Sequence, residues 1–325
     1  MSSSPHDALF KAVFGQPEHA SGALRSIVPL AVAEALDWAS LAPCASSFVD
    51  PALSERHTDL LFSVAWRTGG DAMVYLLFEH QSTSDSRMPF RLLRYLVRIW
   101  ERWLAEHPRA ERLPVIVPVV LYHGAEAWSA PIAFDALFDL PEAVRPSLAP
   151  HLVRFRFVLD DLSDIPDEQL RGRAMTALGR LVEGCFKHAR TSTRPLEFLG
   201  RWAEVLREVM AAHNGMEALT LVMRYILLVN DHVEQPALQA FLERVGGPDA
   251  KDIVMTAGQR LIEQGVQQGV QQGQRELLLE LVRTRFGQQV DAGTEQRVAT
   301  ASREQITAWA KRVLSAATLG ELLAD

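Results

Sequence analysis

The spacing of apolar residues changes twice along the first 125 positions of the chain. Residues 17–40 carry apolar side chains at helical spacing and open with Pro17, which suits the first turn of a helix. Two apolar runs follow over 58–66 and 72–81, with turn-forming residues between them. The pattern therefore predicts a helix followed by a β-hairpin.

Further elements extend this arrangement into a sheet. Residues 47–50 form a short strand candidate, an amphipathic pattern predicts a helix over 88–106, and an apolar run predicts a strand over 113–122. Pro118 within that run indicates a sheet edge or a bulge. The predicted order is α-β-β-β-α-β, which gives an α/β (α+β) fold with a central mixed sheet flanked by helices.

The rest of the chain has helical texture. We expect a sheet-containing domain over 1–162, an all-helical region over 163–250, a connector over 251–274 and a small helical C-terminal domain over 275–325.

The connector contains a Gln/Gly repeat with a period of four. As a helix it would place Gly265, Gly269 and Gly273 on one face, where they permit close approach of a partner helix. We therefore expect self-association of the chain through residues 255–285. Since each glycine costs a helix about 1 kcal/mol, a loose linker is the alternative.

Composition limits the cellular context. Cys44 and Cys185 are the only cysteines and stand in no metal or redox spacing, which fits a reducing compartment. The N-terminus lacks the pattern of a secretory signal, and no stretch of about 18 apolar residues occurs. We expect a cytoplasmic protein without a membrane span. The net charge of −7 means that any DNA contact must use a local basic face.

The hairpin brings polar residues to one end of the sheet. With the turn of the hairpin centred near Gly69, the numbers of residues that face each other across the two strands add up to about 139. Asp59 therefore lies opposite the segment from Glu79 to Gln81. Strand alternation puts Glu79 and Gln81 on one face and His80 on the other. Converging carboxylates are what a magnesium ion requires for phosphodiester hydrolysis. Alternatively, these strand ends simply emerge into solvent.

Asp59 followed about twenty residues later by Glu79-x-Gln81, within this order of elements, resembles the PD-(D/E)XK nuclease superfamily, with Gln81 at the position usually held by lysine. The chain is most similar to the recombination-promoting nuclease (Rpn) family, often described as putative transposases. The similarity continues through further segments in the same order, namely His6-Asp7-Ala8-Leu9-Phe10-Lys11, Thr58-Asp59-Leu60-Leu61-Phe62, Phe78-Glu79-His80-Gln81-Ser82, Arg91-Leu92-Leu93-Arg94-Tyr95 and residues 113–124.

The resemblance implies a magnesium-dependent bacterial DNA endonuclease linked to recombination or mobile DNA. Asp59 and Glu79 would bind Mg²⁺ or another divalent cation, and Gln81 would orient the attacking water or the scissile phosphate. Because a neutral amide cannot supply the charge of a lysine, either the activity is low or a second cation such as Lys11 takes its place. Asp7 and Lys11, four residues apart, would share a helix face, or they form an ordinary i,i+4 pair.

Five arginines recur on one face of the helix predicted over 88–106 and its start. Their steps of three and four residues favour contacts with DNA phosphates, and a solvated helix face is the alternative. The arginines are Arg87, Arg91, Arg94, Arg98 and Arg102.

Two rival functions remain. Gln81 and the acidic net charge fit a catalytically weak relative that acts as a DNA-binding or protein-interaction module. A nuclease acting on RNA or on damaged ends is the second rival. His57 and His80 match no common zinc spacing, and the sequence contains no nucleotide-binding or serine-hydrolase motif.

Overall fold

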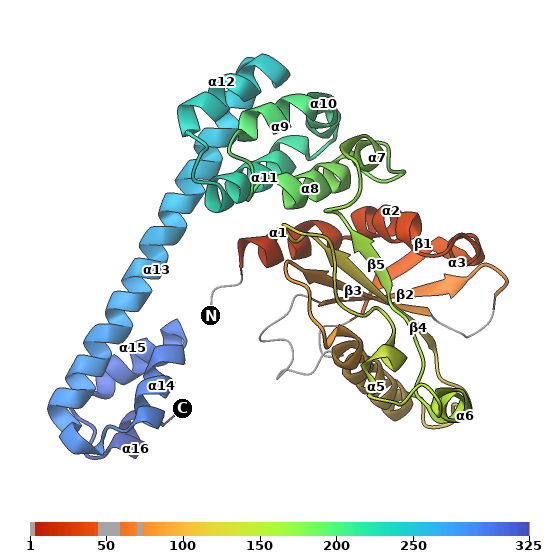
Figure 1. Cartoon of the computed structure of the whole chain (residues 1–325). Helices are drawn as coiled ribbons and strands as arrows, with labels where there is room; N and C mark the ends of the chain where they lie inside the picture. The colour runs from red at the N-terminus through yellow and green to blue at the C-terminus, as the bar shows by residue number, and fades with distance from the viewer. Residues whose placement is uncertain (1–3, 45–58, 70–73, 325) are drawn as a thin grey trace. The chain divides into compact units, whose positions relative to one another are not determined.

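The computed structural model describes residues 4–44, 59–69 and 74–324 (Figure 1). The chain forms two compact units, Ser3–Met255 and a C-terminal unit that begins at Thr256. The finer division at residues 162 and 274 stays a prediction.

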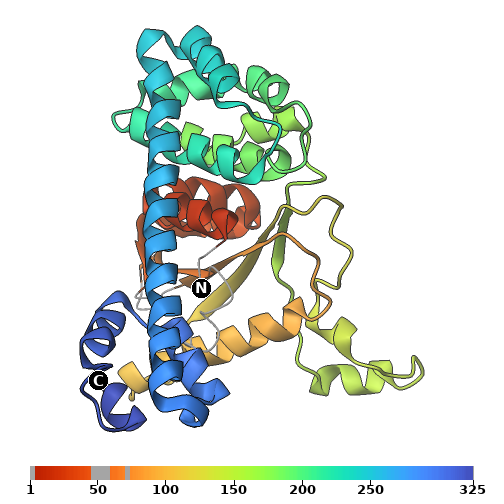
Figure 2. The same ribbon diagram turned by 90° about the vertical axis from the view of Figure 1, so that its left-hand side faces the viewer.

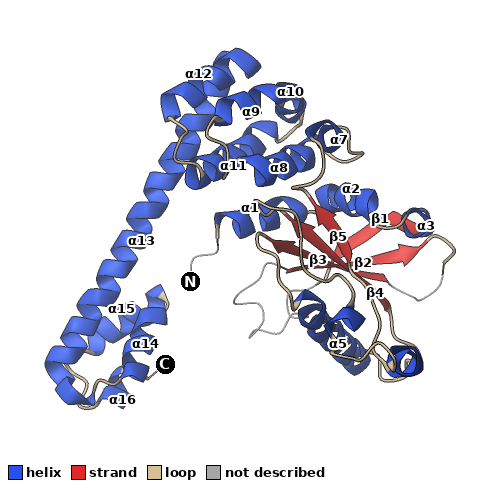
Figure 3. Ribbon diagram, viewed as in Figure 1, coloured by secondary structure: helices blue, strands red, loops and turns tan. Residues whose placement is uncertain are grey.

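The first unit contains one five-stranded sheet in the order β1-β2-β3-β4-β5. The pairs β1–β2 and β2–β3 are antiparallel, whereas β3–β4 and β4–β5 are parallel, so the predicted mixed sheet is confirmed (Figure 3). The strands are β1 (Leu36–Pro43), β2 (Asp59–Trp66), β3 (Val74–Gln81), β4 (Val115–Tyr122) and β5 (Val158–Asp161).

The N-terminal segment departs from the prediction of one helix over 17–40. After α1 (Pro5–Phe14), α2 (Pro17–Ile27) ends early and a short α3 (Leu30–Ala35) leads directly into β1. Val28 is extended because it precedes Pro29, and a proline disfavours helical backbone in the residue before it. The prediction was wrong from Leu36 onward, where pairing of β1 with β2 overrides the helical pattern.

The predicted hairpin is confirmed. Paired residues run from Asp59↔Glu79 to Val64↔Val74, so their numbers add up to 138, one less than predicted. Gly69, in the turn after β2, has a φ of 72°, a left-handed conformation that glycine adopts without strain. The strand candidate at 47–50 lies outside the described residues.

Helix α5 (Met88–Glu106) has the predicted bounds and lies on the opposite side of the sheet from α1 and α2 (Figures 1 and 3). Its buried face, which includes Leu92 and Tyr95, packs in one apolar cluster with Leu61 of β2 and Val120 of β4. Burial of each such side chain stabilises the fold by about 1.5–3 kcal/mol. This cluster fixes α5 against the sheet.

The last two strands refine the sequence reading. β4 begins at Val115 and pairs with β5 only from Val119 onward, so Pro118 lies where β4 has no partner on that side, as expected of an edge. β5 was not predicted, because four residues that end in two aspartates carry almost no strand pattern. Between these strands lie η2 (Phe134–Leu137), α6 (Arg145–Leu148) and η3 (Ala149–His151).

The segment after β5 is helical, as predicted. Its helix α8 packs against α1, α2 and α10, which joins the helical region to the sheet within one unit. The elements are α7 (Asp167–Arg171), α8 (Ala177–His188), α9 (Pro195–Arg201), α10 (Ala203–Ala211), α11 (Gly215–Val229), α12 (Gln235–Gly246) and η4 (Pro248–Ala250).

The C-terminal unit is built on the long helix α13 (Lys251–Phe286), so the alternative of a loose linker at the Gln/Gly repeat is wrong. Its last turns pack with α14 (Ala292–Thr300), α15 (Arg303–Arg312) and α16 (Leu319–Leu322) around the buried Trp309, and η5 (Gly287–Gln289) makes the turn (Figure 2). Among the described helices, none combines the length and the apolar character that crossing a bilayer requires.

Candidate functional site

Three of the predicted catalytic positions, Asp59, Glu79 and Gln81, meet at one end of the sheet. Asp59 is the first residue of β2 and pairs with Glu79 of β3. Gln81 is the last residue of β3 and lies beside Tyr122 at the end of β4. The backbone therefore brings these three polar positions together, although they are up to 22 residues apart in sequence.

The end of β4 at this site is anchored to β5. The Asp161 carboxylate accepts hydrogen bonds from the Trp128 backbone N–H at 2.7 Å and from the Ser163 hydroxyl at 2.6 Å. The Tyr122 hydroxyl donates to the Glu126 carbonyl at 2.8 Å. The loop that follows β4 is thus held beside the site.

A buried ion triad fixes β5 to the helical region. Arg173 donates to both carboxylate oxygens of Asp160, at 2.6 and 2.8 Å, and to Glu183 of α8 at 2.9 Å. Their exposed fractions are 10%, 4% and 0% respectively. Burial raises the pKa of the Glu183 carboxyl, and the nearby Arg173 opposes that shift. Sequence reasoning missed the triad, although a glutamate among the apolar residues of α8 was a signal that a buried partner exists.

A second cluster joins α1 to the end of β4. His6 of α1 hydrogen-bonds through Nδ1 to the Tyr225 hydroxyl at 2.8 Å, and its ring centroid lies 5.0 Å from that of His123. His123 follows β4 directly and stacks on Phe186 of α8. Burial raises the pKa of the Tyr225 hydroxyl. The cluster positions α1 relative to the sheet end through aromatic contacts.

The two candidates on α1 have separate surroundings. Ser4 caps α1, because its side-chain hydroxyl accepts a hydrogen bond from the Asp7 backbone N–H at 3.2 Å. Lys11 is exposed in the last turn, and α1 packs against α8 and α11. Because α1 and α5 cover opposite sides of the sheet (Figure 1), the structure does not bring Lys11 and the arginines of α5 together. The catalytic roles of Asp7 and Lys11 stay predictions.

The arginines of α5 and its N-cap do not form a uniform stripe. Arg91 pairs with Asp85 at 3.2 Å, Arg98 with Glu101 at 3.3 Å, and Arg102 with Glu106 at 3.0 Å. Over residues 85–106, five arginines against three carboxylates leave a net charge of +2, lower than residues 87–104 alone indicate.

Exposure also separates the arginines. The side chain of Arg91 is 14% exposed, whereas that of Arg98 is 57% exposed, and Arg87 and Arg94 are exposed as well. Arg87 and Arg94 are therefore the members best placed for contact with a large ligand, and Arg91 is set apart by its low exposure.

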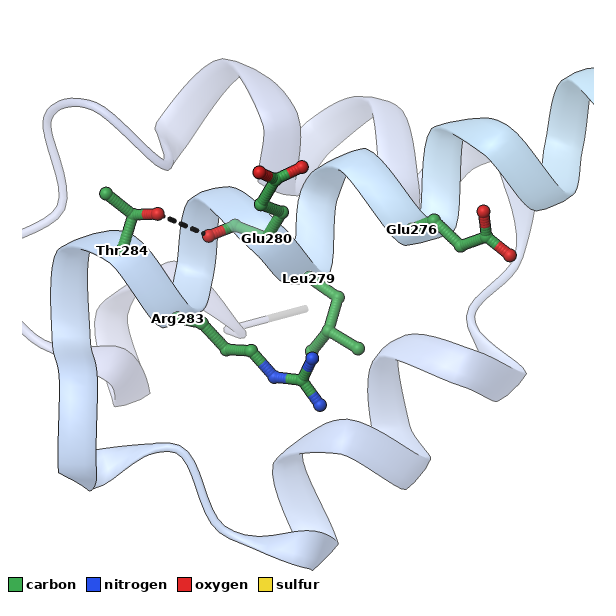
Figure 4. A pocket seen from close by; sticks show the side chains of 5 residues that line it. All are labelled: Glu276, Leu279, Glu280, Arg283 and Thr284. Atoms are coloured by element: carbon green, nitrogen blue, oxygen red, sulfur yellow. Dashed lines mark hydrogen bonds between the residues drawn. The ribbon is translucent and has the colours of Figure 1, made fainter.

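The C-terminal unit has a pocket along α13, lined by Glu276, Leu279, Glu280, Arg283 and Thr284 (Figure 4). Arg283 is paired with Glu295 of α14, and the Thr284 hydroxyl donates to the Glu280 carbonyl at 2.8 Å. These polar groups stabilise the helical unit, and we assign no chemistry to the pocket.

The Gln/Gly segment of α13 presents an exposed apolar stripe. Ile262, Val266, Val270 and Leu277 have exposed fractions of 69%, 60%, 56% and 58%. A Cβ built on any of the three repeat glycines would meet no atom within 4 Å, so this face is open. Self-association through residues 255–285 therefore stays a prediction with a defined surface.

Comparison with known proteins gives a consistent result. The family described as "Putative transposase, YhgA-like" matches residues 4–217, which include the sheet and the helices packed on it. No solved structure matches the chain.

Several relatives are aligned over most of their length. The recombination-promoting nuclease RpnD of Escherichia coli O157:H7 is 32% identical over 80% of this chain and 94% of its own length. The recombination-promoting nuclease RpnA of Escherichia coli K12 is 30% identical over 81% and 85%. The inactive recombination-promoting nuclease-like protein RpnE of the same strain is 28% identical over 81% and 83%.

These matches confirm the resemblance drawn from the sequence. The order of the matched segments, from His6 through the hairpin to the end of β4, falls within the region that the family covers. The chain belongs to the YhgA-like putative transposase family, together with the recombination-promoting nucleases.

Proposed function

We propose that this protein is a magnesium-dependent endonuclease that hydrolyses phosphodiester bonds in DNA and takes part in recombination or in the movement of mobile DNA. The observation that carries the proposal is the pairing of Asp59 with Glu79 at the end of the sheet. The names of the relatives RpnD and RpnA support the nuclease activity and its link to recombination.

The donor set fits a hard divalent cation. Directly opposed residues of an antiparallel pair have Cβ atoms about 4.5–5.5 Å apart, so two carboxylates at such positions can reach one ion at about 2.1 Å each. Carboxylates on Asp59 and Glu79 would satisfy this requirement, with water and a phosphate oxygen completing the shell. The bound ion would polarise the scissile phosphate and lower the pKa of a bound water.

Gln81 would act by positioning. Its amide has two N–H donors and a carbonyl acceptor, and it can hold the attacking water and a phosphate oxygen at once. Because the amide is neutral, it orients groups without balancing the charge of the transition state.

DNA would approach along α5. The exposed Arg87 is the N-cap of α5 and the exposed Arg94 lies in α5, which begins seven residues after Gln81. Phosphate contacts from arginine fix a duplex without reading its sequence. A local basic surface of this kind reconciles DNA binding with the net charge of −7.

Cleavage of supercoiled plasmid tests the proposal. Wild-type protein should nick the plasmid with Mg²⁺ and not with EDTA, and replacing either Asp59 or Glu79 by Ala should abolish cleavage. Asp139→Ala, which removes an exposed carboxylate after η2, is the matched control and should cleave like wild type. Equal cleavage by wild type and both site variants would contradict the assignment.

A catalytically weak DNA-binding protein is the second candidate. Gln81 in place of lysine favours it, and the relative RpnE is named inactive. This candidate predicts that wild type shifts a DNA duplex on a gel without cleaving it at any Mg²⁺ concentration. Single-stranded RNA and nicked duplexes in the same assay would reveal a different nucleic-acid substrate.

A further inference from the structure

Arg190 lies in the turn that follows α8, and its side chain is exposed. Among the residues that the structure describes, its guanidinium has neither a hydrogen-bond nor an ion-pair partner. Lys187, near the end of the same helix, is by contrast paired with Asp167 at 3.6 Å. The N–H donors of Arg190 are therefore open to a ligand in solution.

The backbone that carries Arg190 is fixed on both sides. Asn230, which follows α11 directly and is 4% exposed, donates through its side-chain amide to the Ala189 carbonyl at 2.6 Å and to the Ser192 carbonyl at 2.8 Å. The Ser192 backbone N–H donates to the His188 carbonyl at 3.0 Å. The turn between these bonds is thus part of the packed helical region, and the fold sets where the arginine side chain begins.

The turn lies beside the end of β4. Phe186, one helical turn before Arg190, stacks on His123 with ring centroids 5.0 Å apart, and His123 follows β4 directly. Burial raises the pKa of the Tyr122 and Tyr225 hydroxyls, and the positive charge of Arg190 opposes that rise in both. Because the Coulomb interaction weakens with distance, the guanidinium lies near both hydroxyls.

Arg190 reaches the candidate site from the side of the sheet that α5 does not cover. Tyr122 is the backbone partner of Gln81, so the end of β4 belongs to the site. Helix α8 packs against α1 and α2, and these helices cover the side of the sheet opposite α5 (Figure 1). The exposed arginines Arg87 and Arg94 belong to the α5 side. Positive charge is therefore available on both sides of the sheet end.

We propose that Arg190 binds a backbone phosphate of the DNA held at the candidate site, on the side opposite the phosphates that Arg87 and Arg94 contact. The proposal rests on the DNA substrate of the proposed function and adds a contact from the helical region. The planar fork of a guanidinium can donate two parallel hydrogen bonds to one phosphate. Arg190 is a binding residue in this arrangement, since it fixes the duplex and takes no part in the reaction. A basic residue that only balances the dipole at the end of α8 is the alternative.

The affinity of the full chain for a DNA duplex, measured by fluorescence anisotropy with Ca²⁺ in place of Mg²⁺, tests this contact. Arg190→Gln should raise the Kd about five- to tenfold at about 0.1 M salt, because release of one counterion contributes a factor of about eight for each tenfold fall in salt concentration. The slope of log K against log salt concentration should become smaller by about 0.9. Arg190→Lys keeps the charge, so its slope should equal that of wild type.

Two further variants locate the effect. Arg207→Gln removes an exposed arginine of α10 and is the matched control, which should leave the Kd and the slope unchanged. Arg94→Ala combined with Arg190→Gln should lower log K by the sum of the two single effects, because residues on opposite sides of the sheet share no phosphate. Plasmid cleavage by Arg190→Gln at saturating DNA should keep kcat within about threefold of wild type, as expected when only ground-state binding is lost.

The contrary outcomes are distinct. An unchanged Kd and slope in Arg190→Gln would show that this arginine only balances the end of α8, and the proposal would be wrong. A loss of affinity together with a lower melting temperature, with no recovery in Arg190→Lys, would assign a structural role and also overturn it. In both cases cleavage by wild type leaves the nuclease function standing. Wild-type protein that binds DNA through Arg190 but does not cleave would overturn the nuclease function alone.

Discussion

Replacing Arg173 by methionine would remove the only cation from the ion triad and leave Asp160 and Glu183 facing each other in the interior. The three hydrogen bonds of 2.6–2.9 Å and exposed fractions of 10% or less identify a buried network. Removing one partner of a buried ion pair costs about 3–5 kcal/mol. We expect a loss in the free energy of unfolding within that range.

Thermal unfolding followed by circular dichroism measures this loss. In a unit of this size, 1 kcal/mol lowers Tm by about 2–4 °C, so Arg173→Met should lower it by about 6–20 °C. Arg190→Met, at an exposed position, is the control and should change the free energy of unfolding by less than about 0.5 kcal/mol.

A triple variant separates the triad from simple packing. Arg173→Met combined with Asp160→Asn and Glu183→Gln contains no buried charge, so it should regain most of the lost stability. If the single variant is as stable as wild type, or if the triple variant is no more stable than the single one, the triad does not hold β5 to α8 in the way described.

Three further predictions concern other parts of the chain. Burial raises the pKa of the Glu183 carboxyl to about 8, so the folded chain binds this proton more tightly than the unfolded chain does. The free energy of unfolding should therefore fall as the pH rises from about 4.5 to 8. Urea titrations at several pH values measure this fall, and Glu183→Gln should make it smaller. Replacing Arg87 and Arg94 together by Ala should weaken DNA binding to all duplexes alike. It should also flatten the slope of log K for DNA binding against log salt concentration by about 1–2. An unchanged slope would show that these arginines only form a solvated helix face. Sedimentation of Val266→Asp with Val270→Asp should give monomers at concentrations where wild type self-associates, and equal masses would contradict the predicted helical interface.

The sequence pattern predicts the hairpin and α5 well because both rely on local periodicity. The alternation of apolar residues and the turn around Gly69 set the register of β2 and β3 to within one residue. The apolar face of α5 set both of its ends correctly. Local rules were sufficient here because the burial pattern and the backbone preference agree.

The pattern fails where pairing between distant segments decides the structure. β1 is extended because its backbone pairs with β2, although the segment is spaced like a helix, and β5 is held by β4 despite its short and acidic sequence. The partners of the arginines were also missed, because Asp85 lies before the predicted helix and helical spacing alone does not show that Glu106 pairs with Arg102.

The candidate site was predictable only as positions. The register of the hairpin identifies Asp59 and Glu79 as neighbours, but no periodicity reports the burial of Arg91 or its contact with Asp85. Similarly, Asp160, Arg173 and Glu183 follow no motif spacing, and only the fold brings them together.

The most direct test of the metal site is the anomalous diffraction of crystals grown with Mn²⁺ and a short DNA duplex. We predict one strong anomalous peak bonded to the carboxylates of Asp59 and Glu79, with those two groups about 4–6 Å apart and metal–oxygen distances near 2.1 Å. A peak bonded to neither residue, or none with DNA bound, would contradict the claim that these two strands hold the catalytic ion.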